Sequence, residues 1–297
     1  MRWLNKNLMN SSLTLIKIKA LMVGGLLLLV VFLVITEREN LEPVLTPVPI
    51  PQTQFVVPKN ILARAVLVYD LTTQQTLFAK QADRPLPTAS LSKVMTALLA
   101  TENLNATSTV ALSEDFFSLT KLINLTLLAS INDGAEALAM AVEQQTGKNF
   151  VETMNRRARE LGLEQTFFLD ASGLDWSTNL AGGYSSARDL ATLFSYIVEQ
   201  EPALLEATKE TGLIIKSGTG QLYFPANTNK AASAIPDLLA SKTGSTDLAG
   251  GNLVTVFDRG LNQPVIIVVL GSTLDGRFAD TTTLAQATLE YFAKNAF

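Results

Sequence analysis

The part of the chain after residue 60 has strand-like sequence at its two ends and helical sequence between them. Residues 62–80 and four runs that follow about residue 210 are rich in β-branched and other apolar residues, as strands are. Helical patterns cover 90–103, 119–129, 133–146, 148–162 and 186–198, and a last one covers 280–296. This order predicts an α/β fold of the α+β type, in which one antiparallel sheet is assembled from both ends of the domain around an inserted helical lobe. A cleft between sheet and lobe is the expected place for a site.

An uninterrupted apolar run precedes this region. Residues 20–35 are sixteen apolar or glycine residues, which as a helix would cover roughly 24 Å of the ~30 Å bilayer core, and Ile18 and Thr36 lengthen the run. Four basic residues and no acid precede it, so we expect a cytoplasmic N-terminus and an exported remainder. We predict an uncleaved single-pass anchor in the cell membrane; a cleaved signal peptide is the alternative, but no small-residue cleavage signature directly follows the run.

Proline marks a boundary between this anchor and the rest of the chain. Five prolines between residues 40 and 60 exclude a helix or a central strand there and predict a semi-extended stalk. The predicted organisation is a cytoplasmic tail at 1–19, a transmembrane anchor at 20–36, a proline-rich linker at 37–60 and a folded domain at 61–297.

The residue types that the chain lacks narrow its chemistry. It has no cysteine and no histidine, which excludes disulfides and a thiol nucleophile and argues against a zinc site of the usual kind. A serine nucleophile would therefore need a base other than imidazole. After the apolar run, 19 Lys and Arg residues face 27 acids, so nucleic acid is not an expected partner. No metal or other cofactor is predicted.

Three short motifs each occur twice, so none is informative alone. Ser-x-x-Lys occurs at Ser90 and Lys93 and at Ser118 and Lys121, Ser-x-Asn at Ser130 and Asn132 and at Ser177 and Asn179, and Lys-Thr/Ser-Gly from Lys242 and from Lys216. A serine and a lysine three apart share one helix face, so either pair could react. The plain alternative is a serine N-cap followed by a solvated lysine, and for the other motifs a helix cap and a strand end.

The surroundings of one copy of each motif resemble those of the serine D-alanyl-D-alanine carboxypeptidases, a low-molecular-weight group of penicillin-binding proteins. The stretches that carry the resemblance, in family order, are PTASLSKVMTALLA, LLASINDGAEALA, FVETMNRRARELGLEQTFF, GYSSARDLATL and SKTGSTDLAGGNLV. The resemblance runs from about residue 61 to the end and implies a β-lactamase/DD-peptidase-like fold. It also implies that Ser118 is a helix N-cap, that Ser177 lies in a loop and that Lys216 lies on an earlier strand of the sheet.

The family likeness implies roles for four residues in the reaction. Ser90 would attack the peptide bond between two terminal D-alanines of a peptidoglycan stem peptide, with Lys93 as general base. Such a lysine must be neutral, which requires desolvation or a nearby cation. Ser130 would relay the proton to the leaving amine, and Asn132 would hold Lys93 and the substrate amide. Ser90 could also cap its own helix.

Five further residues are implied in substrate binding. Lys242 and Thr243 would meet the terminal carboxylate, and Gly244 would let the strand edge approach closely. The backbone N–H groups of Ser90 and Ser245 would form the oxyanion hole. Arg277 would lie near the carboxylate, with a surface salt bridge as its plain alternative. Members of the family often carry histidine where this chain has Ser172 and Ser245.

Several functions fit these motifs. The expected one is a D-Ala-D-Ala carboxypeptidase that β-lactam antibiotics inhibit. A cross-link-cleaving DD-endopeptidase would share every motif. A serine β-lactamase would need a carboxylate poised over the deacylating water, and the only acids in the 164–183 region are Glu164, Asp170 and Asp175. A penicillin- or wall-binding protein without turnover is the non-enzyme alternative.

Overall fold

The computed structural model describes residues 17–33 and 54–295. Residues 17–33 form an exposed helix, and no helix in the described residues is both long enough and apolar enough to cross a membrane. Most of the predicted tail and linker, and the end of the predicted anchor, lie outside the described residues. Residues 54–295 belong to a separate unit, to which the rest of this section refers.

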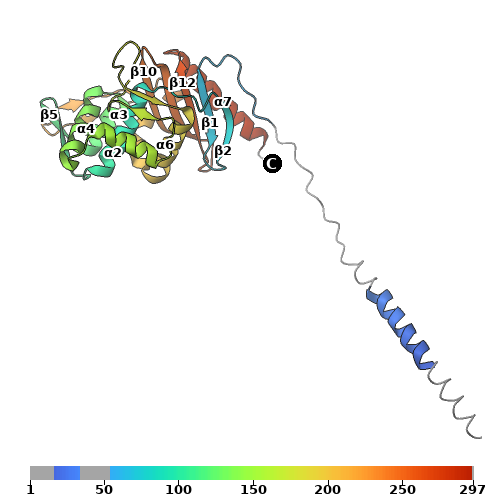
Figure 1. Ribbon diagram of the computed structural model, residues 1–297. Coiled ribbons are helices and arrows are strands. Elements are labelled where there is room, and N and C mark those ends of the chain that lie inside the picture. The colour runs from blue at the N-terminus through green and yellow to red at the C-terminus, as the bar shows by residue number, and fades with distance from the viewer. Residues whose placement is uncertain (1–16, 34–53, 296–297) are drawn as a thin grey trace, which may run out of the picture. The chain divides into compact units, whose positions relative to one another are not determined.

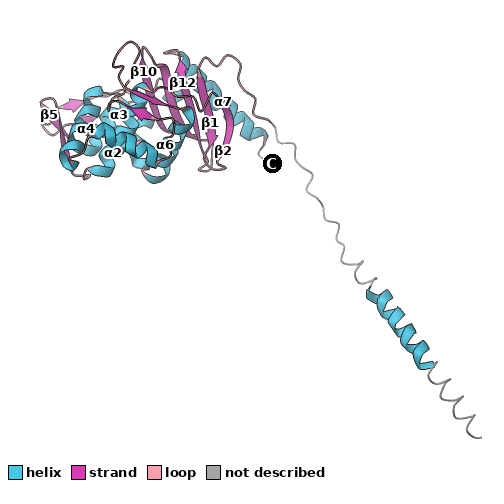
Figure 2. Cartoon of the chain, viewed as in Figure 1, coloured by secondary structure: helices cyan, strands magenta, loops and turns pink. Residues whose placement is uncertain are grey.

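A five-stranded antiparallel sheet organises this unit (Figures 1 and 2). In sheet order the strands are β10 (Leu238–Thr246), β11 (Gly250–Asp258), β12 (Pro264–Ser272), β1 (Ala65–Asp70) and β2 (Gln75–Lys80). The register of the central pair sets Ala65 opposite Leu270, so the beginning and the end of the domain meet in the middle of the sheet. The predicted antiparallel sheet from both chain ends is therefore confirmed.

The alternation of side chains along the strands gives the sheet two apolar faces. On β1, Ala65 and Leu67 point into a core shared with the helical lobe, whereas Val66 and Val68 point into a second core under α7 (Gly276–Lys294). Both faces are covered by helices, which is why every residue of β1 except Tyr69 is buried.

The lobe is inserted between β2 and β10 and consists mainly of helices. They are α2 (Lys93–Asn103), α3 (Leu119–Leu128), α4 (Asn132–Thr146), α5 (Phe150–Glu160) and α6 (Ala187–Gln200). Short strand pairs connect them: β4 (Thr109–Leu112) with β5 (Asp115–Ser118), β7 (Gly183–Ser185) with β3 (Leu86–Pro87) and β6 (Phe167–Phe168), and β8 (Ile215–Lys216) with β9 (Leu222–Tyr223). Helices α2 and α4 pack together through largely buried, small and apolar residues.

Two sequence-based expectations differ from the observed elements. The last helix begins at Gly276 rather than at residue 280, because the hydroxyl of Thr273 accepts a hydrogen bond from the Gly276 N–H (2.9 Å) and starts the helix one turn earlier. Lys216 lies in the two-stranded β8–β9 ribbon and not in the main sheet, so that expectation was wrong. Its segment pairs with Leu222 instead, across a tight turn.

Gly134 provides a test of the helix packing in the lobe. A Cβ atom added there would lie 2.2 Å from Oγ1 of Thr126, on the neighbouring α3. Glycine to alanine in a helix ordinarily stabilises by up to ~1 kcal/mol. We expect Gly134→Ala to have the opposite sign and to lower the free energy of unfolding by about 1–3 kcal/mol, because it overpacks this crossing.

Thermal unfolding of three variants checks this prediction. Oγ1 of Thr126 is buried and has no hydrogen-bond partner in the described residues, so Thr126→Ala removes the clash without breaking a bond. The double variant should recover most of the loss. A Gly134→Ala variant as stable as the parent would show that the α3–α4 crossing is looser than described.

Candidate active site

Ser90 lies in a short 3-10 turn, η1 (Ala89–Ser92), that leads directly into α2. The side-chain amide of Asn252 on β11 donates to the carbonyls of Pro87 (2.9 Å) and Thr88 (3.1 Å), which ties this turn to the sheet. Ala89 has a φ of 51°, in the left-handed region that non-glycine residues rarely adopt. Ser90 is half-buried and does not cap the helix, so the expected capping role is absent.

Lys93 is fully buried one helical turn from Ser90. Its Nζ lies 2.8 Å from Oγ of Ser90 and donates a second hydrogen bond to the carbonyl of Ser172 (2.7 Å). Burial lowers the pKa of Lys93 to about 8, although the carboxylates of Asp170 and Glu136 act to raise it. A substantial fraction of Lys93 is therefore neutral near physiological pH and able to accept a proton.

Lys242 and Ser130 form a second pair of the same kind. Nζ of Lys242 donates to Oγ of Ser130 (2.8 Å) and to the carbonyl of Thr243 (2.9 Å). Burial lowers the pKa of Lys242 well below the usual range, and the positive charges of Lys93 and Arg277 lower it further. The strand that carries Lys242 packs against the turn that carries Ser90, which brings the two pairs into one site.

The two pairs come from different parts of the fold. Ser130 follows the end of α3 and has a φ of 60°, which turns the chain sharply into α4. Lys242 lies on the edge strand β10. Gly244 on the same strand packs against η1, where an added Cβ would lie 2.6 Å from the carbonyl oxygen of Thr88. Glycine at this position thus lets the edge strand reach the serine turn.

The remaining predicted site residues lie around these pairs. Asn132 begins α4, but its side chain forms no hydrogen bond with the described residues, so the expected contact with Lys93 is absent, and Lys93 donates to the Ser172 carbonyl. Ser245 is exposed on β10. Nη1 of Arg277 donates to the carbonyl of Gly244 (2.8 Å), and Arg277 forms no salt bridge among residues 54–295.

The structure also places two residues at the site that the motifs did not indicate. Thr228 lies 2.6 Å, hydroxyl to hydroxyl, from Thr243 and its N–H donates to the carbonyl of Leu128 (3.2 Å). Asp170 accepts hydrogen bonds from the loop that carries Ser172. Both belong to irregular segments without periodicity, so no sequence pattern could have indicated them.

The second copies of the motifs lie elsewhere and differ in environment. Lys121 is exposed, and its Nζ donates to the carbonyl of Lys216 rather than to a serine (2.8 Å). Ser118 occupies the N-cap position of α3, as expected, but its hydroxyl makes no capping hydrogen bond. The hydroxyl of Ser177 donates to the Asn179 side chain within an exposed loop (2.8 Å). Burial of the lysine is what distinguishes the first Ser-x-x-Lys from the second.

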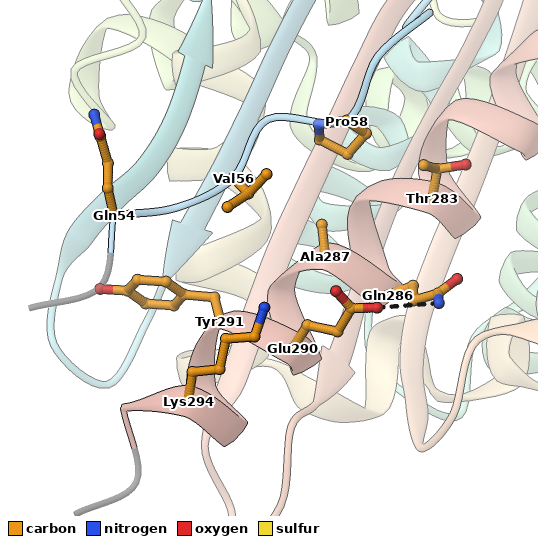
Figure 3. Close-up of a pocket in the computed structure, with 9 residues that line it drawn as sticks. All are labelled: Gln54, Val56, Pro58, Thr283, Gln286, Ala287, Glu290, Tyr291 and Lys294. Atoms are coloured by element: carbon orange, nitrogen blue, oxygen red, sulfur yellow. Dashed lines mark hydrogen bonds between the residues drawn. The ribbon is translucent and has the colours of Figure 1, made fainter.

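A separate cavity lies on the α7 side of the sheet. It has a volume of about 270 Å³ and is lined by residues 54–58 and by α7, including Glu290, Tyr291 and Lys294 (Figure 3). None of the predicted site residues lines it. We therefore do not consider it the site of the reaction.

The arrangement of the two pairs suits acyl transfer through a serine. A neutral Lys93 can take the proton of Ser90 and thereby activate the hydroxyl. Lys242, bonded to Ser130, can hand a proton through that hydroxyl to a departing amine. Lys93 thus supplies the base that a histidine-free chain needs.

Comparison with known proteins agrees with this chemistry. The family described as Peptidase_S11, D-alanyl-D-alanine carboxypeptidase, matches residues 99–273. The chain is 27% identical to the D-alanyl-D-alanine carboxypeptidase DacF of Bacillus subtilis over 75% of its own length and 61% of that protein. It is 30% identical to a D-alanyl-D-alanine endopeptidase of Haemophilus influenzae over 73% of its own length and 78% of the relative.

A solved structure shows the same fold. Penicillin-binding protein D2 from Listeria monocytogenes in the ampicillin-bound form superposes with a TM-score of 0.69 at 30% identity, covering 78% of this chain and 99% of that one.

The pH dependence of Ser90 acylation tests the role of Lys93. We expect the rate to rise through a pH of about 8, because only neutral Lys93 can accept the proton. Lys93→Ala should lower the rate by about 10²–10⁴-fold and remove this rise. Mass spectrometry of the Ser90 peptide after reaction with an activated acyl ester measures the rate.

Lys121→Ala is the matched control, since it removes the lysine of the other Ser-x-x-Lys. It should leave rate and profile unchanged. An unaltered profile in Lys93→Ala would eliminate Lys93 as the base.

Proposed function

Because the chain belongs to the D-alanyl-D-alanine carboxypeptidase family of serine peptidases, as its motifs predicted, we propose that it removes the terminal D-alanine from peptidoglycan stem peptides. The observation that carries this proposal is the contact of 2.8 Å between Ser90 Oγ and the buried amine of Lys93. β-Lactams, which carry an activated amide, are proposed to acylate the same serine.

The proposed reaction begins with transfer of the Ser90 proton to Lys93. One N–H of the neutral amine stays on the Ser172 carbonyl, which leaves its lone pair for the hydroxyl. The Ser90 oxygen attacks the carbonyl carbon between the two D-alanines, and the oxyanion is bound by the N–H groups of Ser90 and Ser245. Ser130 then passes a proton to the leaving amine, and water hydrolyses the acyl-enzyme.

The substrate carboxylate is proposed to bind at β10. Thr243 and Lys242 lie on this strand, with Arg277 bonded to Gly244 beside them. An anion bound beside Lys242 and Arg277 would favour their protonated forms, which loss of hydration disfavours. Asn132, whose side chain has no hydrogen bond among the described residues, is proposed to bind the substrate amide.

The occupation of the loop acids favours a carboxypeptidase over a β-lactamase. Oδ1 of Asp170 is bonded to Ser172 and Gly173. Asp175 accepts hydrogen bonds from the Thr246 hydroxyl (2.9 Å) and the Leu248 N–H (3.1 Å). Both carboxylates are thus engaged by the protein itself, and the third acid of the region, Glu164, is exposed and has, among the described residues, no hydrogen bond or ion pair that would place it at the site. A DD-endopeptidase remains the second candidate, because three relatives carry that name.

Two substrates distinguish a carboxypeptidase from a β-lactamase, an endopeptidase and a binding protein. The full chain should release D-alanine from a peptide that ends in D-Ala-D-Ala and form a long-lived adduct with a fluorescent penicillin at Ser90. Ser90→Ala should lower D-alanine release by at least about 10³-fold and abolish the adduct.

Other outcomes identify the alternatives. Rapid turnover of the penicillin would indicate a β-lactamase. Preference for cross-linked dimers over the linear peptide would indicate an endopeptidase, and absence of the adduct would indicate a binding protein.

We further propose that residues 20–36 anchor the protein in the cell membrane, with the tail at 1–19 in the cytoplasm and a catalytic domain at 61–297 outside. The support is the apolar run, the basic residues that precede it and the absence of acids before Glu37. In this arrangement the linker at 37–60 would hold the catalytic domain away from the bilayer.

Substitution within the apolar run tests the anchor. Arginine near the centre of a membrane helix costs about 2.5–3.5 kcal/mol per residue on insertion scales. Leu27→Arg combined with Leu28→Arg should therefore shift the protein from the membrane fraction to the soluble fraction, whereas the parent sediments with membranes. A mature protein whose N-terminus begins after residue 36 would instead indicate a cleaved signal peptide.

A further inference from the structure

Asp170 is the centre of the loop that contacts Lys93. Its Oδ1 accepts hydrogen bonds from the N–H of Ser172 (2.8 Å), the hydroxyl of Ser172 (2.9 Å) and the N–H of Gly173 (2.5 Å). Its Oδ2 accepts the indole N–H of Trp176 (2.7 Å). One carboxylate thus fixes the backbone on both sides of the Ser172 carbonyl bond.

That carbonyl is the second partner of Lys93. The hydrogen bond from Lys93 Nζ to Ser172 O is 2.7 Å long and buried. The preceding carbonyl, of Ala171, accepts the hydroxyl of Thr96 on α2 (2.6 Å), so the loop is also held one turn further along the helix. The position of the amine therefore depends on a loop whose shape Asp170 determines.

Asp170 also faces Lys93 electrostatically. The carboxylate of Glu136 faces Lys93 from α4, and the amine of Lys242 faces Lys93 from β10. The hydroxyl of Ser90 contacts Lys93 from the turn that precedes α2. The two carboxylates act to raise the pKa of Lys93, against its burial. Glu136 is exposed and has no hydrogen bond to the loop in the described residues, so its influence on Lys93 is that of charge alone.

There is little room at Asp170 for a different side chain. A Cβ atom added at Gly182 would lie 2.3 Å from Asp170 Oδ2, and one added at Gly173 would lie 2.0 Å from the carbonyl oxygen of Ala89. The loop therefore packs directly on the turn that carries Ser90. Trp176 closes the other side of the carboxylate, with 59% of its side chain exposed.

We infer that Asp170 is a positioning residue that fixes the Ser172 carbonyl against Lys93 and acts on the charge of that amine. The inference rests on the proposed function, since it requires Lys93 to be the base for Ser90. Asp170 makes no contact with the reacting atoms and acts only through Lys93 and the loop. Because the negative charge stabilises the protonated amine, it strengthens Lys93 as a proton acceptor once the loop has placed it.

Three substitutions separate the charge of Asp170 from its position. Asp170→Asn keeps the shape of the side chain but removes its charge. Asp170→Glu keeps the charge, but its side chain is one methylene too long for the packed loop. Glu136→Gln removes a charge that faces Lys93 without touching the loop. The measurement is the acylation rate of Ser90 by a fluorescent penicillin in the full chain as a function of pH. Asp170→Asn is also made together with Trp176→Phe. In the single variant the new amide N–H₂ could point at the indole N–H of Trp176, and two donors would then face each other.

The expected results differ between the variants. Asp170→Asn, alone or with Trp176→Phe, should move the acidic limb of the profile about 1 unit to lower pH, as loss of a nearby opposite charge does, and should lower the plateau rate. Asp170→Glu should lower the plateau roughly tenfold without moving the limb, since slight misplacement of a base is costly. Glu136→Gln should move the limb to lower pH with a smaller loss of plateau rate than Asp170→Asn, since it weakens the base but leaves the loop in place.

The outcomes also distinguish failure of this inference from failure of the proposed function. An Asp170→Asn variant with the parent's limb and plateau overturns the inference. A lower plateau with an unmoved limb overturns the role of the charge and leaves Asp170 a purely structural residue. If the parent protein forms no adduct at Ser90 at any pH, the proposed function fails instead, and with it the role of Lys93.

Discussion

The site depends on the burial of two lysine side chains in one place. An isolated ammonium group is costly to remove from water, so burial drives each amine toward its neutral form, and each amine is compensated by a hydroxyl and a carbonyl. Lys93 and Lys242 are among the largest fully buried side chains of the described chain. The elements that position Ser90 also bury these two amines and so keep water away from them.

Three separate parts of the fold meet around the two lysines and bury them. The sheet contributes β10, whose Gly244 allows it to approach the serine turn. The helical lobe contributes α2 and the chain reversal at Ser130, and the loop at Asp170 closes the remaining side of Lys93. Asn252 joins the first two, because it bonds both the Thr88 carbonyl of the turn and the Gly271 N–H of β12.

The sequence predicted the regular elements and the paired motifs well, because strands, helices and motif order leave local patterns. The four motif residues Ser90, Lys93, Ser130 and Lys242 do come together in two hydrogen-bonded pairs. The partner of Lys93 was not predictable: a backbone carbonyl, that of Ser172, takes the place expected for Asn132, and backbone atoms carry no sequence signal. Thr228 was likewise missed, and Asp170 was considered only as an acid that a β-lactamase could use, since the positions of both residues follow from loop conformation and not from periodicity.

The pairing of β1 with β12 has a consequence for how the domain folds. The first strand of the domain, which begins at Ala65, pairs with a strand that contains Leu270, far along the chain. Contacts between such distant segments form slowly, because a long loop must close before they are made. The edge strand β10, which carries Lys242, joins β1 only through β11 and β12, so we expect the Lys242–Ser130 pair to form late in folding, after these long-range strand contacts.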